Sequence, residues 1–271
     1  MSSEQYFPER ASASQAQAAV LHTRNKIVLV DFASPTLRER AIRWLWYHLS
    51  RLRNDALGRS RPSFVFSEQL LENALLLREV DESVRKVLDF GGFESTLPLA
   101  LAAIGVRVTV VDQRRYPFQD ERVQIVQHDI LQPMTDLPAD FDLVYSISTI
   151  EHVGLGGYGD PRQARGDALA VAHLWEKVRP GGRLFFSVPA GEASEKRGYR
   201  IYSPQSVRDL LPAAGMIRYF RKVGRKGVWR ECSEEVIARH RYESYYADAP
   251  VEGVAIALVC KPSSEASAVR R

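Results

Sequence analysis

Cysteine and long apolar runs are scarce in this chain. Its 271 residues include two cysteines, Cys232 and Cys260, which lie far apart in the sequence. This pair can build neither a disulfide framework nor a thiolate metal site, so we expect a reducing, cytoplasmic environment and no bound metal. No run of about 18 apolar residues is present to span a bilayer. Met1–Gln17 is rich in Ser, Ala and Gln and lacks the apolar core of a signal peptide.

Concentrated charge is also absent. The formal net charge is only +4, and the arginines are scattered between acidic residues although the sequence pI is about 9.1. Nucleic-acid surfaces need a basic stripe or patch, so we expect no nucleic-acid partner. A hydrophobic fraction of 45% with 26% charged residues is typical of a soluble globular protein. A small anionic substrate remains compatible with this composition.

No internal repeat is found, and the N-terminal part differs in pattern from the rest. Ile27–Phe32 is a short apolar run that predicts a strand. Thr36–Leu57 has apolar residues at helical spacing, with Ser34 as the N-cap and Pro35 in the first turn. This helix either packs on the main domain or contacts a membrane surface or a partner subunit. Glu68–Glu79 predicts a second helix.

These patterns divide the chain into four parts. We expect residues 1–26 to form a disordered leader and residues 263–271 a disordered tail. Between them we predict an N-terminal helical extension over residues 27–80 and one main domain over residues 81–262.

The main domain alternates between strand and helix patterns. Predicted helices are Leu97–Ala103, Ala168–Val178 and Pro204–Pro212, the last capped by Ser203. Seven predicted strands are Val87–Phe90, Val106–Val111, Val123–Gln127, Phe141–Ser146, Leu184–Val188, Ile217–Val223 and Val254–Cys260. Strands joined through helices predict an α/β fold with a doubly wound, mostly parallel seven-stranded sheet. Ligands bind such sheets at the carboxyl ends of the strands.

Three acidic residues follow three successive predicted strands. Asp89 stands at the end of the first strand, before Gly91 and Gly92, and could accept a hydrogen bond from an ammonium group. Asp112 ends the second strand, where a carboxylate can accept both hydroxyls of a ribose. Asp129 follows the third, where it could meet an adenine amine. Each alone is typical of a turn or cap, but the ordered set predicts a nucleoside site.

The glycine turn separates two classes of nucleoside cofactor. A nicotinamide dinucleotide needs Gly-x-Gly-x-x-Gly so that its pyrophosphate can approach the helix. This chain has Gly91 and Gly92 and then Phe93, Glu94 and Ser95, with no later glycine. Glu94 adds negative charge where a pyrophosphate would lie. The turn therefore favours a cofactor without phosphates.

These segments resemble the motifs of class I S-adenosylmethionine (SAM)-dependent methyltransferases. The matching segments, in order, are Val87–Ser95, Val108–Asp112, His128–Ile130, Phe141–Val153 and Arg179–Pro189. The chain keeps the first glycine of the family's turn and has Phe93 and Ser95 in place of the later two. Ser146–Gly156, Tyr158–Pro161 and Arg200–Ser203 further resemble a bacterial subgroup associated with sugar and polysaccharide biosynthesis.

The resemblance implies a Rossmann-like fold, SAM as the cofactor and a set of site residues. Asp89 is expected near the amino-acid end of the cofactor, Asp112 at the ribose and Asp129 at the adenine. The Ser146 region is expected to border the methionine moiety. The full set of expected cofactor-binding residues is Asp89, Phe90, Gly91, Gly92, Phe93, Asp112, Gln113, Asp129, Ile130 and Ser146.

Glu151 and His152 follow the fourth strand, on the lip where an acceptor should arrive. His152 is the candidate general base, since a hydroxyl acceptor must lose a proton near neutral pH; its alternative role is to order the loop. Glu151 either orients His152 or caps a helix. A Glu-His dipeptide without further ligands does not predict a metal site.

Substrate-binding candidates lie in the segments that follow. Tyr158 could stack on a sugar or anchor its glycine-rich loop, which has the composition of a lid. Arg200 and Tyr202 could reach the same pocket, and Arg200 suits an anionic group unless it forms a surface salt bridge. Arg114 and Arg115 are either solvated or packed over the adenine. The aromatic segment Trp229–Gly253 either packs in the core or contributes to the acceptor pocket or a dimer contact.

The sequence thus predicts a methyltransferase that modifies a hydroxyl of a sugar or saccharide-derived metabolite, with His152 as base. Methylation of an amine on an amino sugar and a non-catalytic partner subunit with the same fold are the alternatives.

Overall fold

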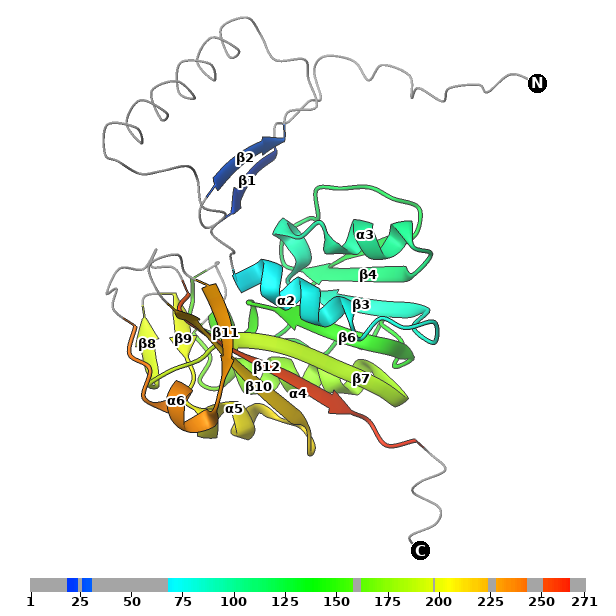
Figure 1. Cartoon of the computed structure of the whole chain (residues 1–271). Helices are drawn as coiled ribbons and strands as arrows, with labels where there is room; N and C mark the ends of the chain where they lie inside the picture. The colour runs from blue at the N-terminus through cyan, green and yellow to red at the C-terminus, as the bar shows by residue number, and fades with distance from the viewer. Residues whose placement is uncertain are drawn as a thin grey trace, which may run out of the picture. The chain divides into compact units, whose positions relative to one another are not determined.

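The computed structural model (Figure 1) describes residues 19–23, 26–30, 68–157, 162–196, 198–223, 228–242 and 251–263. The chain divides into two compact units, Met1–Pro62 and Ser63–Arg271. In the first, β1 (Ala19–Thr23) pairs antiparallel with β2 (Lys26–Val30). The predicted strand Ile27–Phe32 largely coincides with β2. Within the predicted leader, residues 19–23 form β1, whereas residues 1–18, the helix Thr36–Leu57 and most of the tail lie outside the described residues.

The second unit is built on a sheet of eight strands (Figure 1). Their order is β11-β10-β12-β7-β6-β3-β4-β5. Strands β3 to β7 are mutually parallel, whereas β12 and β11 run antiparallel to their neighbours. The bounds are β3 (Lys86–Phe90), β4 (Arg107–Asp112), β5 (Val123–Gln127), β6 (Phe141–Ile147), β7 (Val178–Pro189), β10 (Met216–Val223), β11 (Val228–Cys232) and β12 (Gly253–Cys260). The Rossmann-like, mostly parallel architecture predicted from the sequence is confirmed.

Helices cover both faces of this sheet. On one face, α2 (Glu68–Leu77) and α3 (Leu97–Ala103) contribute Leu76 and Leu101 to a core with Leu143 of β6. On the other, α4 (Gly166–Lys177), α5 (Pro204–Leu210) and α6 (Glu234–Ala238) pack against a second core. The central strands are buried on both sides, which explains why the sequence of β4 is almost continuously apolar. The Ser203 side chain accepts a hydrogen bond from Ser206 N–H, as the predicted N-cap requires.

The strand count is higher than the seven predicted. β11 adds an eighth strand at the sheet edge through antiparallel pairing with β10. Its residues Val228 and Trp229 stand in a charged segment without clear alternation, so no strand was predicted there. A small hairpin, β8 (Ser194–Lys196) with β9 (Tyr199–Ile201), was also missed. Its three-residue strands are too short for a period-2 pattern to be recognised.

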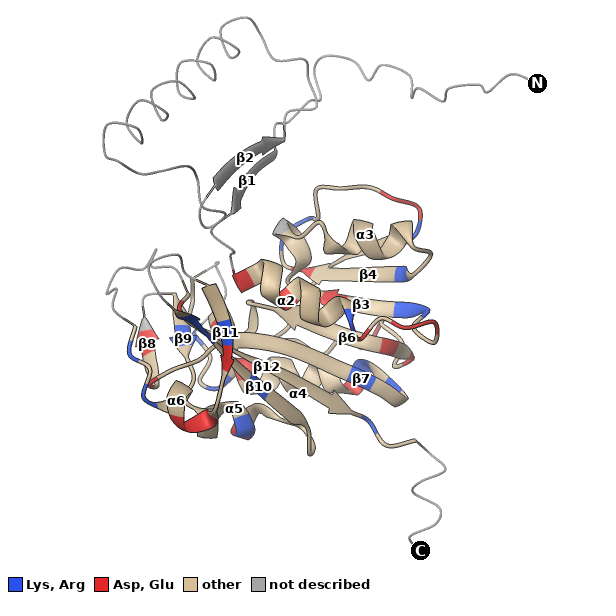
Figure 2. Cartoon of the chain, in the orientation of Figure 1, with Lys and Arg blue, Asp and Glu red and all other residues tan. Residues whose placement is uncertain are grey.

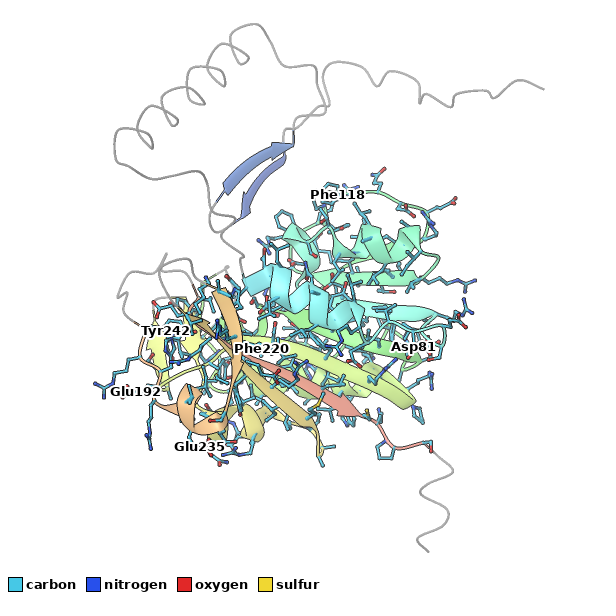
Figure 3. The ribbon with its side chains drawn as sticks, in the orientation of Figure 1. Asp81, Phe118, Glu192, Phe220, Glu235 and Tyr242 are labelled. Atoms are coloured by element: carbon cyan, nitrogen blue, oxygen red, sulfur yellow. The ribbon has the colours of Figure 1, made fainter. Side chains whose placement is uncertain are left out.

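Charge is interspersed over the described part of the chain rather than gathered in one stripe (Figure 2). Asp81 lies at the end of the sheet where β3 and β6 begin, and Tyr242 lies at the other end, near β8 and β9 (Figure 3). The strand order reverses between β3 and β6, since the chain continues from β3 to β4 on one side and reaches β6 on the other. The crevice outside the carboxyl ends of these two strands is the expected ligand site of a doubly wound sheet.

Candidate functional site

The turn after β3 is shaped by close contacts that exclude side chains. Gly91 has φ +81°, and a Cβ there would lie 2.3 Å from the side chain of Thr149. A Cβ on Gly92 would lie 2.4 Å from Oδ2 of Asp89. Glycine is therefore required at both positions, for its backbone conformation at Gly91 and for space at both. The result is a turn of bare backbone at the switch point of the sheet.

Asp89 lies beneath this turn and is almost fully buried, with 2% of its surface exposed. It pairs in register with Tyr145 of β6, which is also buried. Burial raises the pKa of Asp89 to about 7; the nearby Tyr145 hydroxyl opposes the rise and the charge of Asp112 adds to it. No cationic side chain of the described residues forms an ion pair with Asp89. A ligand that brings an ammonium group here would favour the ionised carboxylate.

Asp112, at the end of β4, is also buried, but both of its carboxylate oxygens are engaged. Oδ1 accepts hydrogen bonds from Arg114 N–H at 2.8 Å and Arg114 Nε at 3.2 Å. Oδ2 accepts one from Phe93 N–H at 3.3 Å. The guanidinium of Arg114 also lies over the Phe93 ring, 4.1 Å from its centroid. Arg114 is therefore not simply solvated. It is hydrogen-bonded to the Asp112 carboxylate, which is predicted to bind the ribose hydroxyls.

The other predicted cofactor residues lie along the same strand ends. The backbone carbonyl of Gln113 accepts a hydrogen bond from Gln127 Nε2, and Asp129 Oδ1 accepts one from Leu131 N–H. Phe90, Ile130 and Ser146 are buried. The Ser146 hydroxyl makes no hydrogen bond with the described residues. The structure brings these residues to one edge of the sheet, while their contact with a cofactor stays a prediction.

His152 is held in one orientation by the β8–β9 hairpin. Its Nδ1 hydrogen-bonds the carbonyl oxygen of Gly198. A carbonyl oxygen only accepts, so Nδ1 carries a proton in this hydrogen bond. Nε2 lies 3.7 Å from Oε1 of Glu151, which is fully buried. This arrangement fixes the His152 ring and places Nε2 beside a carboxylate.

Arg200 and Tyr202 both have protein partners in this structure. Arg200 Nη1 donates to the carbonyl of Val153 at 2.8 Å, and its Nε lies 3.7 Å from Asp167 Oδ2. The hydroxyl of Tyr202 donates to the same Asp167 oxygen at 2.9 Å. The two residues thus fasten the Glu151–His152 turn to α4, and their predicted role in substrate binding stays a prediction. Tyr158 lies outside the described residues.

One residue of this region was missed by sequence reasoning. Glu72 of α2 is fully buried, and its Oε1 accepts a hydrogen bond from Ser148 Oγ at 2.8 Å. Ser148 follows β6, with φ +45°, and its N–H donates to Ser187 Oγ of β7. The sequence does contain an indication of Glu72. Glu68, Glu72 and Leu76 are spaced four residues apart and share the buried face of α2, where apolar residues are expected.

Among the described residues, no group of three or more His, Cys, Asp or Glu is placed to hold a metal ion. No helix in the described part of the chain is both long and apolar enough to cross a membrane.

Comparisons with known proteins find methyltransferases among the relatives of this chain. The Ubiquinone biosynthesis O-methyltransferase of Stutzerimonas stutzeri (strain A1501) is 26% identical over 153 residues, which are 52% of this chain and 61% of that protein. The protein of the same name from Pseudomonas aeruginosa (strain UCBPP-PA14) is 26% identical over 179 residues, 60% of this chain and 72% of that protein. The match thus spans less than two thirds of the first of these relatives.

A family model described as Caenorhabditis protein of unknown function, DUF268, matches residues 102–225, less than half of the chain. Among solved structures, the 1,6-didemethyltoxoflavin-N1-methyltransferase of Burkholderia thailandensis, with bound S-adenosylhomocysteine (SAH), is similar with a TM-score of 0.46 and 17% identity. The match covers 86% of this chain and 94% of that one.

Proposed function

We propose that this chain is a SAM-dependent methyltransferase acting on a small acceptor. The observation that carries the proposal is the bare turn of Gly91 and Gly92 at the switch point, with the buried Asp89 carboxylate directly beneath it. Asp112 ends the neighbouring strand β4, next to this turn. The two curated relatives, both named as O-methyltransferases, support the same activity.

The residues present fit a SAM molecule. A turn without side chains lets a nucleoside approach the backbone closely. Asp89 offers a buried carboxylate without a cationic partner to the ammonium end of the amino-acid moiety. Asp112 offers two carboxylate oxygens to ribose hydroxyls once Arg114 moves away. When bound, SAM supplies an electrophilic methyl group.

His152 then acts as the general base for a hydroxyl acceptor, as the sequence predicts. The Gly198 carbonyl fixes the protonated Nδ1, so Nε2 is the atom that takes the acceptor proton. The Glu151 carboxylate, 3.7 Å from Nε2, would stabilise the imidazolium that results. Arg200 holds the carbonyl of Val153 and thereby keeps this turn in place. We propose a saccharide or a related metabolite as the acceptor and the cytoplasm as its location, with a homodimer as an open alternative.

An amine acceptor is the second candidate, because Glu72 and Glu151 make the region beyond β6 acidic. Such an acceptor depends less on His152. A non-catalytic subunit with this fold is the third candidate, and it is distinguished by binding measurements alone.

Two measurements test the proposed function. Calorimetric titration of the full chain with SAM and SAH should detect binding, whereas a nicotinamide dinucleotide should not bind; no binding of SAM or SAH would favour a non-catalytic protein. Methyl transfer from radiolabelled SAM is then screened over saccharides, nucleotide sugars and amino sugars. With an acceptor found, His152→Ala should lower kcat by about 100-fold or more, retain SAH binding, and regain turnover with added imidazole. Unchanged turnover would remove His152 from the role of base.

A further inference from the structure

Glu72 is the most completely buried acid beside the candidate site whose role the chemistry above does not explain. It lies on the inner face of α2, which covers β3 and β6 in Figure 1. Its hydrogen-bond partner Ser148 follows β6, and Ser148 is bonded to Ser187 near the end of β7. Glu72 therefore lies over the carboxyl ends of these strands. Its contact residue Ser148 is three residues before Glu151 in the chain.

The surroundings of Glu72 are acidic and offer it no cation. The charged groups of the described residues that act on it are Glu68 on the same helix and Glu151 on the turn after β6. Lys222 of β10 approaches Glu68 at 3.9 Å and forms no ion pair with Glu72. One oxygen of Glu72, Oε2, is buried and accepts no hydrogen bond from the described residues. Burial, together with Glu68, raises the pKa of Glu72 to about 8.

An unpaired acid in such a place is costly to the fold. A buried carboxylate whose neighbouring donors are the neutral hydroxyls of Ser148 and Ser187 lacks the compensation that a paired charge receives. A bound cation would restore the balance, since it would donate to Oε2 and favour the ionised form. An anionic group would instead lie beside the acidic side chains of Glu68 and Glu151.

We propose that Glu72 is an acceptor-binding residue whose Oε2 accepts a hydrogen bond from an ammonium group of the acceptor, with Ser148 and Ser187 holding the carboxylate in place. The inference rests on the proposed methyltransferase function, because it treats the space beyond β6 as the acceptor site. It specifies that function further: the acceptor carries a positively charged amine, and acceptors with a carboxylate or phosphate at this position are excluded.

The test uses a matched pair of small probes, ethanolamine and ethylene glycol, titrated into the SAH-containing full chain and followed by NMR. An aliphatic amine stays protonated between pH 6.5 and 8.5, since its pKa is about 10. The Glu72 carboxylate becomes ionised over this range, so ethanolamine should bind on the order of tenfold more tightly at pH 8.5 than at pH 6.5. Ethylene glycol should bind more weakly and with no dependence on pH.

Substitutions assign the effect to Glu72. Glu72→Gln should abolish the preference for ethanolamine and its pH dependence, while Glu72→Asp should retain part of both. Glu82→Gln, at an exposed acid in the turn between α2 and β3, should leave both unchanged. The affinity of each variant for SAH should stay within about twofold of the wild type.

The proposal is overturned if ethanolamine fails to bind, binds no better than ethylene glycol, or keeps its preference in Glu72→Gln. Should that variant not fold, the pH dependence of the wild type and the Glu72→Asp variant carry the test. Failure of the proposed function is seen separately as the absence of SAH binding in calorimetry, and the probes are then titrated without SAH.

Discussion

The carboxylate of Asp89 occupies the space that a side chain on Gly92 would need. A Cβ on Gly92 would lie 2.4 Å from Oδ2 and 2.8 Å from the carboxyl carbon of Asp89. Asp89 is itself fixed, because its strand is paired on both sides, with β4 and with β6. The small size of the turn and the burial of the acid are thus two aspects of one packing arrangement.

Gly92→Ala should therefore disturb both the fold and the cofactor site. The added methyl group must displace Asp89 or the turn, and such overpacking typically costs about 1–3 kcal/mol of unfolding free energy. Affinity for SAH should fall about tenfold or more, as measured by calorimetry. Ala100→Ser, on the exposed side of α3, is the control for adding an atom nearby. Normal SAH affinity in Gly92→Ala would mean that the cofactor does not depend on this turn.

Arg114 should compete with the cofactor for Asp112. The Arg114 guanidinium donates to Oδ1 of Asp112 and lies close to its Oδ2. The Arg114 side chain in this ion pair is 41% exposed. An exposed pair of this kind contributes at most about 1 kcal/mol. Arg114→Ala should accordingly tighten SAH binding up to about fivefold, and Asp112→Asn should weaken it about tenfold or more.

The chain supplies a matched control for this prediction. Arg122 makes the same backbone, Nε and Nη2 contacts with Asp120, two residues before it. Arg122→Ala should leave SAH affinity unchanged. If Arg114→Ala instead weakens SAH binding, the guanidinium over Phe93 contacts the cofactor rather than competing with it.

The raised pKa of Glu72 predicts how stability depends on pH. Its pKa is about 8 in the folded chain and near 4.5 in the unfolded chain. Between these values the folded state binds more protons, so Glu72 lowers the free energy of unfolding as pH rises from about 4.5 to 8. Glu72→Gln should remove this loss and exceed the wild type in stability at pH 8 by about 1 kcal/mol or more. Urea unfolding at pH 5 and pH 8 measures the difference, with Glu82→Gln as the control; equal slopes for wild type and Glu72→Gln would contradict the assignment.

Tyr202→Phe should destabilise the fold by removing a partner of Asp167. The Tyr202 hydroxyl is the donor to Asp167 Oδ2 at 2.9 Å, and both residues are buried. Leaving a buried carboxylate oxygen without this donor costs about 1–3 kcal/mol. The control is Tyr219→Phe, because the buried Tyr219 hydroxyl has no hydrogen-bond partner in the described part of the chain. Thermal unfolding should separate the two variants. Equal stabilities, with a raised KM for the acceptor in Tyr202→Phe, would instead support substrate binding by Tyr202.

Much of the architecture was predictable because its signals are local. The strands β3, β4 and β6 are short, mostly apolar runs bounded by turns, and the Ser203 side chain caps the start of α5. Asp89, Asp112 and Asp129 could be assigned to one edge because parallel strands end on the same side of a sheet. The β11 strand could not be predicted, since it exists through its pairing with β10 rather than through a pattern of its own.

The sequence by itself determined the doubly wound sheet, the glycine turn and the order of acids along the strand ends, because period, turn chemistry and strand direction are properties of neighbouring residues. Only the tertiary structure decided which partners these groups have. It fixed His152 against Gly198 and placed Glu72 of α2 over Ser148 and Ser187. Such contacts join residues from different segments, and their burial sets the charge of each acid, which no local pattern specifies.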